Sequence, residues 1–410
     1  MRTSRWVRAR LVVVVGVLVV TATGASSARD ETGVPELPHP SSHGLELVKA
    51  QPVVPGTGPD ESMMVDFTVA TEEIFEPRGP NGQDLDVAPT VRVWLPPHYD
   101  ADRRRPYPVL YLLHGGGGGY WQWTMTYPPT NLPGTDAKAV LDHAIDADPT
   151  DATPGTPFPG IVVMPEAGWI GWYTNWTGGA QGGYAPDWED FHVGQLVPWI
   201  DANFNTNGRR SGRAIAGVSM GGLGALMYAT RHPLTFSAVG SFSGPADVRL
   251  PLLHTTVSDN ASGFPGAGAS FGFAGLDTEE QWLTDPAPGD VEGRFRAVFG
   301  PAGPRGDWPQ RNPIVRPLTF HAFNGKLGLY SGQASPIAQT PEPEIGETNQ
   351  AFHHVLDSWW VDHRYCAGPG AHTTPFFESD LADFINYVYA TPWATCTTNP
   401  GWEEDWEPTP

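Results

Sequence analysis

The sequence predicts an α/β fold in which a mostly parallel central sheet carries helices on both of its faces. Short apolar runs alternate with helix-like segments along the chain, a pattern typical of parallel strands joined by helical crossovers. Two glycine-rich turns, 115–119 and 217–221, each come directly after an apolar run. Ligands bind at the carboxyl ends of the strands in such sheets, so we expect both turns at one functional edge.

Each element is expected from the hydrophobic pattern of its segment. An antiparallel opening pair is expected at 64–68 and 90–95. Buried parallel strands are expected at 109–113, 160–164, 214–218, 238–242 and 327–330, with a last strand-like run at 359–365. Helices are expected at 136–146, 188–203 and 221–230, with a final helix at 378–390.

The turn at 217–221 carries the strongest chemical signal. It reads Gly-Val-Ser-Met-Gly between a strand-like and a helix-like run, which is the Gly-x-Ser-x-Gly pattern in the setting of a nucleophilic serine. A tight turn pushes the Ser219 side chain out above the sheet, and glycines avoid collisions with the neighbouring backbone. The following helix directs backbone N–H groups toward developing negative charge. A chance match in a small-residue loop is the alternative interpretation.

The turn at 115–119 agrees with a nucleophilic serine. His114 and five glycines follow the apolar run 107–113, where serine hydrolases of the α/β class supply a second oxyanion donor. We therefore predict that the N–H groups of Gly116 and Met220 form an oxyanion hole. His114 is predicted to be structural or to line the substrate pocket, not to act as a base. A flexible linker is the alternative, because glycine runs often serve that purpose.

A serine nucleophile needs a base, and in this fold class the histidine comes last in the chain, after the acid. His372 lies in the loop 368–372, after the last strand-like run and before the final helix. It is the predicted base. His353 and His354 fall within a helix-like run and are predicted to be surface or core residues, while His363 falls in the strand-like run itself.

The orienting carboxylate stays open on position alone. Glu342, Glu344 and Glu347 all follow the strand-like run 327–330 by a loop. Asp247, after the preceding strand, is a fourth candidate. The helix dipole favours acids at helix starts, so we expect at least two of the glutamates to be solvated residues of this kind.

The N-terminal residues 1–28 are predicted to be a secretory signal. Arginines precede an apolar core at 11–20, which is too short to span a bilayer stably. The leader holds four arginines and no acid, so its removal shifts the formal net charge from −21 to −25. This charge argues against a nucleic-acid partner. No later apolar run approaches the length of a membrane span, so we expect a secreted protein without stable membrane insertion.

Three further segments follow the leader. Residues 29–60 are predicted to be irregular, 61–396 to form the catalytic domain with an insertion at about 247–325, and 397–410 to be an acidic irregular tail.

Two residue types suggest further contacts. Cys366 and Cys396 are the only cysteines, and in an exported chain we expect a disulfide between them. Two inert buried thiols are the alternative. Trp172 and Trp176, with Trp169, are candidates for a substrate pocket that stacks sugar or acyl groups, and ordinary core packing is the alternative.

From about residue 90 to residue 389, the chain resembles the esterase D and antigen 85 (mycolyltransferase) group, which has the α/β-hydrolase fold. The matching stretches are 111–113, 163–165, 172–176, 217–222, 241–244, 299–301, 308, 311–313 and 370–372. In this group the acid is a glutamate seven residues before an asparagine and ten before a phenylalanine, so Asn349 and Phe352 imply Glu342. The resemblance implies a serine esterase that needs no cofactor or metal.

The resemblance also bears on the acyl acceptor. Mycolyltransferases carry Asp and Arg at the positions of His114 and Gly117, on the sugar side of the site, and this chain has neither. Hydrolysis of small-molecule, lipid or sugar esters is therefore expected. Acyl transfer to a sugar or lipid hydroxyl is the first alternative, and a non-catalytic secreted binding protein is the second.

Overall fold

The computed structural model describes the chain from residue 34 to residue 405 with gaps. The described residues are 34–54, 60–74, 88–124, 135–145, 155–168, 171–177, 186–250, 298–300, 308–334, 341–390, 396 and 399–405. The predicted leader 1–28 lies outside them, as does most of the predicted insertion 247–325.

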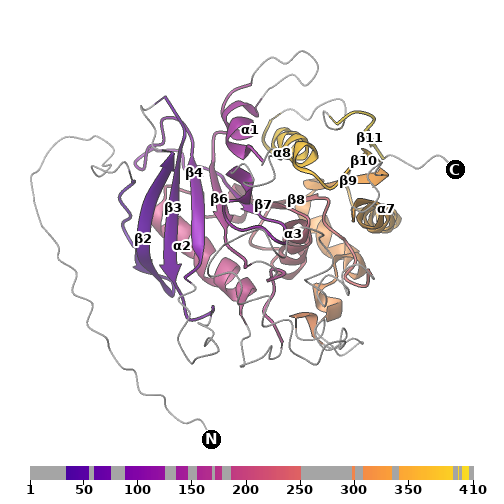
Figure 1. The fold of residues 1–410 in the computed structure, drawn as a ribbon, viewed down its shortest axis with the longest axis horizontal. Coiled ribbons are helices and arrows are strands. Elements are labelled where there is room, and N and C mark those ends of the chain that lie inside the picture. The colour runs from indigo at the N-terminus through magenta and orange to yellow at the C-terminus, as the bar shows by residue number, and fades with distance from the viewer. Residues whose placement is uncertain are drawn as a thin grey trace, which may run out of the picture.

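One mixed sheet of 11 strands forms the centre of the described part of the chain (Figure 1). Its strands are β1 Ser41–Ser42, β2 Leu45–Val54, β3 Met63–Ala70, β4 Thr90–Leu95, β5 Val109–Leu113, β6 Ile161–Pro165, β7 Arg213–Val218, β8 Ala238–Phe242, β9 Leu327–Ala334, β10 Arg364–Pro369 and β11 Glu403–Glu404. Their order across the sheet is β1-β2-β3-β4-β6-β5-β7-β8-β9-β10-β11. Neighbours from β6 to β10 are parallel, and the pairs at both edges are antiparallel. The predicted parallel centre and the antiparallel opening pair, β3 with β4, are confirmed.

The central strands are apolar because both of their faces are covered. Every residue of β5 and of β6 is buried, as expected for parallel strands between two helical layers. The register between β5 and β7 sets Leu113 opposite Gly217. The two strands that lead into the glycine-rich turns therefore end side by side.

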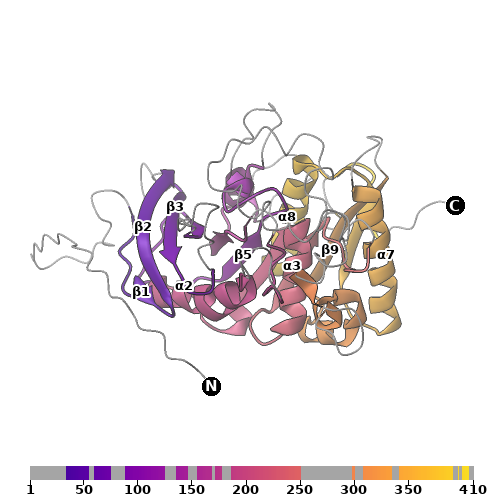
Figure 2. The same ribbon diagram turned by 60° about the horizontal axis from the view of Figure 1, so that its bottom comes forward.

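Helices cover both faces of the sheet (Figures 1 and 2). The helices are α1 Ala137–His143, α2 Val197–Asn203, α3 Met220–Arg231, α7 Glu342–Ser358 and α8 Thr374–Tyr389. Side chains of α2, α3 and α7 pack into one hydrophobic core, and those of α1 and α8 pack into a second. The predicted fold class is confirmed. None of the described helices combines the length and apolar character that a membrane crossing needs.

Shorter helical turns complete the layers. They are η1 Gln122–Thr124, the π-helix η3 Asp190–Leu196 that leads into α2, η4 Arg210–Gly212, η5 Trp308–Arg311, η6 Pro313–Val315 and η7 Pro317–Phe323.

Both ends of the described chain differ from the sequence prediction. The segment 29–60 is predicted to be irregular, but it contains β1 and the long strand β2. β2 lacks a clean alternating pattern and carries Lys49 and Pro52, as edge strands do. It forms by antiparallel pairing with β3. The tail 397–410 likewise contains β11, which pairs with β10.

The predicted strand at 359–365 is also wrong in its bounds. α7 extends to Ser358, and a turn follows in which Trp360 has a φ of 52°. β10 therefore begins only at Arg364, and His363 precedes the strand. The final helix starts at Thr374, earlier than predicted, with Pro375 in its first turn, a position that proline favours.

Candidate active site

Ser219 occupies the turn between β7 and α3. Its φ of 55° lies in the left-handed region, which costs a non-glycine residue about 1–3 kcal/mol. Its N–H donates to the Phe242 carbonyl of β8 at 2.8 Å, and its carbonyl accepts from Leu223 N–H at 3.1 Å. Backbone strain of this kind clusters at functional sites. Here it sets the half-buried Ser219 side chain at the carboxyl edge of the sheet.

The glycines on either side of the turn are required by close backbone approach. A Cβ at Gly217 would lie 2.4 Å from the Gly221 carbonyl oxygen. A Cβ at Gly221 would lie 2.5 Å from the His114 carbonyl oxygen. Both distances are far below the optimal separation of non-bonded heavy atoms. The turn is therefore packed directly against the end of β5.

The glycine loop after β5 lies against the serine turn. A Cβ added at Gly115 would lie 3.3 Å from Ser219 Cβ, and one at Gly116 would lie 3.9 Å from Met220 Cβ. Met220 is the first residue of α3, so its N–H has no acceptor within the helix. Gly115 N–H donates to Gln122 Oε1 at 2.6 Å. No motif in the sequence predicts this contact of Gln122. The loop is held in place, and the predicted role of Gly116 and Met220 as oxyanion donors remains a prediction.

His114 is buried behind this loop. Its Nδ1 donates to the Gly115 carbonyl at 2.8 Å, and its Nε2 accepts from Ala167 N–H at 3.0 Å. A carbonyl only accepts and an amide N–H only donates, so the ring is neutral with its proton on Nδ1. The Tyr173 hydroxyl donates to the His114 carbonyl at 2.9 Å. His114 is 1% exposed and supports the loop, while its contact with a substrate remains a prediction.

Glu342 and His372 meet at the neighbouring strand ends. His372 Nδ1 lies 2.6 Å from Glu342 Oε2, and the Glu342 side chain is fully buried at the start of α7. Glu344 and Glu347 are exposed, and Asp247 makes its ion pair elsewhere. Of the four candidate acids, Glu342 is therefore the one in contact with His372. Its catalytic role remains a prediction.

This contact determines where the His372 ring can take up a proton. A carboxylate only accepts, so Nδ1 carries the hydrogen and Nε2 of the neutral ring keeps its lone pair. The side chain is 10% exposed, and its ring packs edge-on against Phe377 at 5.3 Å between centroids. Such an imidazole can accept a proton at Nε2 while Glu342 stabilises the charged ring.

Two hydrogen-bond donors that the sequence did not predict contact the other carboxylate oxygen of Glu342. The Ser243 hydroxyl donates to Glu342 Oε1 at 2.7 Å, and Gly332 N–H donates to the same oxygen at 2.6 Å. A buried carboxylate needs such donors to offset its lost hydration. In the sequence, Ser243 belongs to the stretch 241–244 that resembles the esterase D and antigen 85 group, and no motif of its own indicates a contact with the acid.

Short contacts join the serine turn to this pair. Ser219 donates its N–H to Phe242, the residue before Ser243. Ser243 in turn bonds Glu342, which holds His372. The carboxyl ends of β7, β8, β9 and β10 therefore bring the three predicted catalytic residues to one edge of the sheet.

The two tryptophans predicted for the substrate pocket lie in the core. Trp172 and Trp176 are 5% and 4% exposed. Trp172 packs against Phe299 with ring centroids 5.9 Å apart, and Trp176 Nε1 donates to the Gly171 carbonyl at 3.0 Å. Trp169 lies outside the described residues. Contact of Trp172 or Trp176 with a substrate remains a prediction.

A buried cluster of aromatic and histidine side chains supports the site. The Tyr173 ring packs closely against Gly224 of α3: a Cβ at Gly224 would lie 2.6 Å from the ring. Its neighbour His192 accepts from the Tyr228 hydroxyl at Nδ1 and donates from Nε2 to the Glu166 carbonyl, both at 2.8 Å. Burial lowers the pKa of His192 to about 3, so this histidine is neutral near pH 7.

The predicted disulfide between Cys366 and Cys396 is confirmed, with Cα atoms 5.6 Å apart. It joins β10 to the chain that follows α8. The His372 loop lies between these two elements, so the bridge closes the segment that carries the predicted base.

Within the described residues, two groups of side chains bring possible metal ligands within 4.8 Å of one another. They are Glu73 with Asp187 and Asp190, and His353 with His354 and Asp357. Neither group includes a residue predicted for catalysis. In the first group, burial and the two neighbouring aspartates raise the pKa of Glu73.

A family model and two relatives match parts of this sequence. Residues 82–386 match the model of the family described as "Putative esterase". An esterase of Mycobacterium tuberculosis (strain CDC 1551 / Oshkosh) is 42% identical over 161 residues, which cover 39% of this chain and 30% of that protein. The diacylglycerol acyltransferase/mycolyltransferase Ag85A of Mycobacterium leprae is 30% identical over 194 residues, which cover 46% of this chain and 47% of that protein. The chain thus matches less than half the length of either relative.

The fold also has a counterpart among solved structures. A ferulic acid esterase superposes with a TM-score of 0.50 at 20% identity, covering 80% of this chain and 97% of that one. At this identity the likeness concerns the fold alone.

Proposed function

This chain belongs to the esterase family, and from that premise we propose that it hydrolyses carboxylic esters through an acyl-serine intermediate. Ser219 is the proposed nucleophile, His372 the base and Glu342 the acid that orients the base. The observation that carries the proposal is the 2.6 Å contact between His372 Nδ1 and the buried Glu342 carboxylate. The Glu342–His372 pair is joined through residues at the end of β8 to Ser219, which lies in a strained turn.

In the first half-reaction, Ser219 Oγ attacks the ester carbonyl carbon while His372 Nε2 takes the hydroxyl proton. The carbonyl π electrons move to the oxygen, and the N–H groups of Gly116 and Met220 donate to the oxyanion. One such donor stabilises the transition state by about 3–4 kcal/mol. The intermediate then collapses, the bond to the alcohol oxygen breaks, and the alcohol leaves with the proton from His372.

In the second half-reaction, water attacks the acyl carbon and gives a proton to His372 Nε2. The new tetrahedral intermediate collapses, Ser219 regains its proton and the carboxylic acid leaves. Throughout, Glu342 accepts from Nδ1 and stabilises the imidazolium. The hydrogen bonds from Ser243 and Gly332 support this role because they hold Glu342 in one orientation.

Acyl transfer to a sugar or lipid hydroxyl is the second candidate, because it uses the same acyl-enzyme and the mycolyltransferase relative is 30% identical. The glycine loop favours hydrolysis. Gly117 has a φ of 76°, a conformation that strains any residue with a side chain. Since residue 117 is a glycine, this position has no guanidinium that could hold a sugar.

We also propose that the protein is exported. The leader-like segment 1–28 and the Cys366–Cys396 bridge support this proposal, since disulfides persist mainly in oxidising compartments. N-terminal sequencing of protein recovered outside the producing cell tests it. A mature chain that starts near residue 29 is expected, and a retained Met1 would contradict export by cleavage.

The proposed reaction is tested with nitrophenyl esters of increasing chain length. Ser219→Ala should lower turnover by about 10⁴-fold or more, as loss of a serine nucleophile does in other enzymes, with unchanged circular dichroism. Ser211→Ala, at an exposed serine before β7, is the matched control and should keep full activity. Residual turnover of Ser219→Ala within tenfold of the parent would exclude this mechanism.

A further inference from the structure

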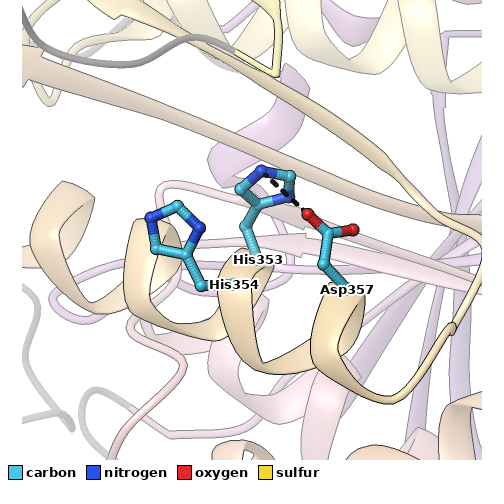
Figure 3. Close-up of side chains that lie close together, drawn as sticks. All are labelled: His353, His354 and Asp357. Carbon is cyan, nitrogen blue, oxygen red and sulfur yellow. Dashed lines mark ion pairs between the residues drawn. The ribbon is translucent and has the colours of Figure 1, made fainter.

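The last turns of α7 carry a second group of reactive side chains, outside the proposed catalytic residues. His353, His354 and Asp357 each place one possible ligand atom within 4.8 Å of the others. Figure 3 shows the three side chains on α7, with the His353–Asp357 ion pair dashed. Imidazole and carboxylate groups are common ligands of Zn²⁺ and related ions.

Hydrogen bonds determine which nitrogen of His353 is available. His363 Nδ1 lies 2.8 Å from the Val361 carbonyl, which only accepts, so Nδ1 carries the hydrogen. In neutral His363 the Nε2 atom is then an acceptor, and its partner at 2.9 Å, His353 Nδ1, donates. The lone pair of neutral His353 therefore lies on Nε2. That atom faces Asp357 Oδ2 at 3.5 Å.

A lone pair and a carboxylate oxygen that face each other repel unless a proton or a cation lies between them. A cation is favoured here by the Asp357 carboxylate, 3.5 Å from His353 Nε2, and by the C-terminal end of the helix dipole.

We propose that His353 Nε2, His354 and Asp357 bind a divalent transition-metal ion of the Zn²⁺ type, with water as the remaining ligand. Two ligand atoms on a tetrahedral zinc ion lie about 3.3 Å apart, given bonds of about 2.0–2.1 Å. The 3.5 Å between His353 Nε2 and Asp357 Oδ2 is close to this separation. His354 and Asp357 are exposed, and each has a possible ligand atom within 4.8 Å of the other two residues of the group.

The buried ligand is already oriented. The His353 ring stacks on Tyr365 with centroids 4.5 Å apart and an interplanar angle of 19°. Its Nδ1 donates to His363, as the second nitrogen of a metal-binding histidine usually does to a neighbouring acceptor. His363 precedes β10, so the ion would brace the end of α7 against this strand. From the sequence, His353 and His354 are predicted to be surface or core residues, so a metal site at this helix end goes beyond that prediction.

The test is calorimetric titration of the chelator-treated, full-length protein with zinc chloride. We expect one saturable site in the wild type and at least about tenfold weaker binding in Asp357→Asn and in His354→Gln. Both positions are exposed, so both variants should fold and keep wild-type ester turnover. Asp60→Asn is the matched control, because it removes the carboxylate of the exposed His98–Asp60 pair, at 3.2 Å. It should bind zinc as the wild type does.

Thermal unfolding provides a second readout. Zinc should raise the unfolding midpoint of the wild type and of Asp60→Asn, because a ligand that binds only the folded state stabilises it, and should leave that of Asp357→Asn unchanged. Wild-type zinc affinity in Asp357→Asn would overturn the proposal. So would the absence of a saturable site in the wild type, or equal loss of affinity in Asp60→Asn.

Discussion

At the scale of single residues, Glu342 shows how a buried carboxylate is stabilised and oriented at once. Its Oε2 pairs with His372, and its Oε1 accepts from Ser243 and Gly332. An unpaired carboxylate at this depth would cost several kcal/mol. The same hydrogen bonds that offset this cost also fix the direction in which Glu342 faces the imidazole.

The first prediction concerns this acid. Glu342→Gln should lower kcat on a nitrophenyl ester by about 10⁴-fold, because an amide group can donate to Nδ1 and stabilise the wrong tautomer. Glu344→Gln, at an exposed position of the same helix turn, should change kcat less than about twofold. If Glu344→Gln proves the damaging change, the acid has been misassigned.

The second prediction concerns Ser243 as a positioning residue. Ser243→Ala removes a hydrogen bond to a charged group, which contributes about 1.5–3 kcal/mol, so kcat should fall roughly tenfold or more with KM little changed. Ser241→Ala is the matched control, since Ser241 lies two residues earlier, in β8, with a buried hydroxyl that has no hydrogen-bond partner. Equal effects of the two substitutions would show that Ser243 acts only through packing.

At the scale of elements, the site depends on how η3 and the glycine loop are joined to α3. His192 of η3 bonds Tyr228 of α3 and the carbonyl of Glu166 after β6. Tyr173 packs on α3 and donates to the His114 carbonyl at the start of the glycine loop. The neutral His192 ring is thus a structural link between η3, α3 and the chain after β6.

The third prediction is a pH dependence of stability that originates at His192. Its pKa of about 3 in the folded state lies below the 6.5 of the unfolded chain, so the unfolded chain binds the proton first as pH falls. The stabilisation is therefore complete above pH 6.5 and is lost toward pH 3, with about 2 kcal/mol lost between pH 7 and pH 5. Urea unfolding at both pH values measures it.

The control for this prediction is His192→Gln, whose amide can keep a donor and an acceptor but does not titrate. Its unfolding free energy should fall by about 2 kcal/mol less than that of the wild type between the two pH values. An identical pH dependence in the variant would place the titrating group elsewhere.

At the scale of the whole molecule, the site is assembled at one edge of a single sheet. Residues that follow β7, β8, β9 and β10 meet there, and these four strands are consecutive and parallel. The Cys366–Cys396 bridge ties β10 to the chain beyond α8. The segment with His372 is thereby closed at both ends.

The fourth prediction concerns this bridge. A disulfide across 30 residues stabilises the fold by about 3–4 kcal/mol in the chain-entropy model. The double variant Cys366→Ala/Cys396→Ala should lose that amount in reversible urea unfolding. The wild type should show no titratable thiol when denatured without reductant, and two titratable thiols would disprove the bridge in the exported protein.

The fifth prediction concerns the fate of the acyl-enzyme. With no charged side chain at Gly117 and with His114 buried, a sugar lacks groups that would hold its hydroxyl ready to attack. Water should therefore take most of the acyl group even with millimolar trehalose present. Mass spectrometry of products from a medium-chain ester measures the ratio, and acyl-trehalose in excess over free acid would favour the acyltransferase.

The sequence by itself determined the central strands and the serine turn. The predicted runs 109–113 and 238–242 coincide with β5 and β8, because parallel strands covered on both faces must be continuously apolar. The turn at Ser219 was equally evident, since its glycines are required by contacts within and beside one short segment. Both signals depend on residues that are close together in the chain, so they can be recognised in the sequence.

Only the tertiary structure decided the features that depend on distant partners. β2 forms because β3 pairs with it, although its own pattern is weak. Glu342 and Glu344 are equivalent by position along the chain. The family resemblance implied Glu342, and only the structure shows that Glu342 is the one buried against β9 and in contact with His372. The predicted strand 359–365 begins only at Arg364, because α7 extends to Ser358 and a turn follows it. Each outcome depends on contacts between segments that are far apart in the chain, and local hydrophobic periodicity does not predict such contacts.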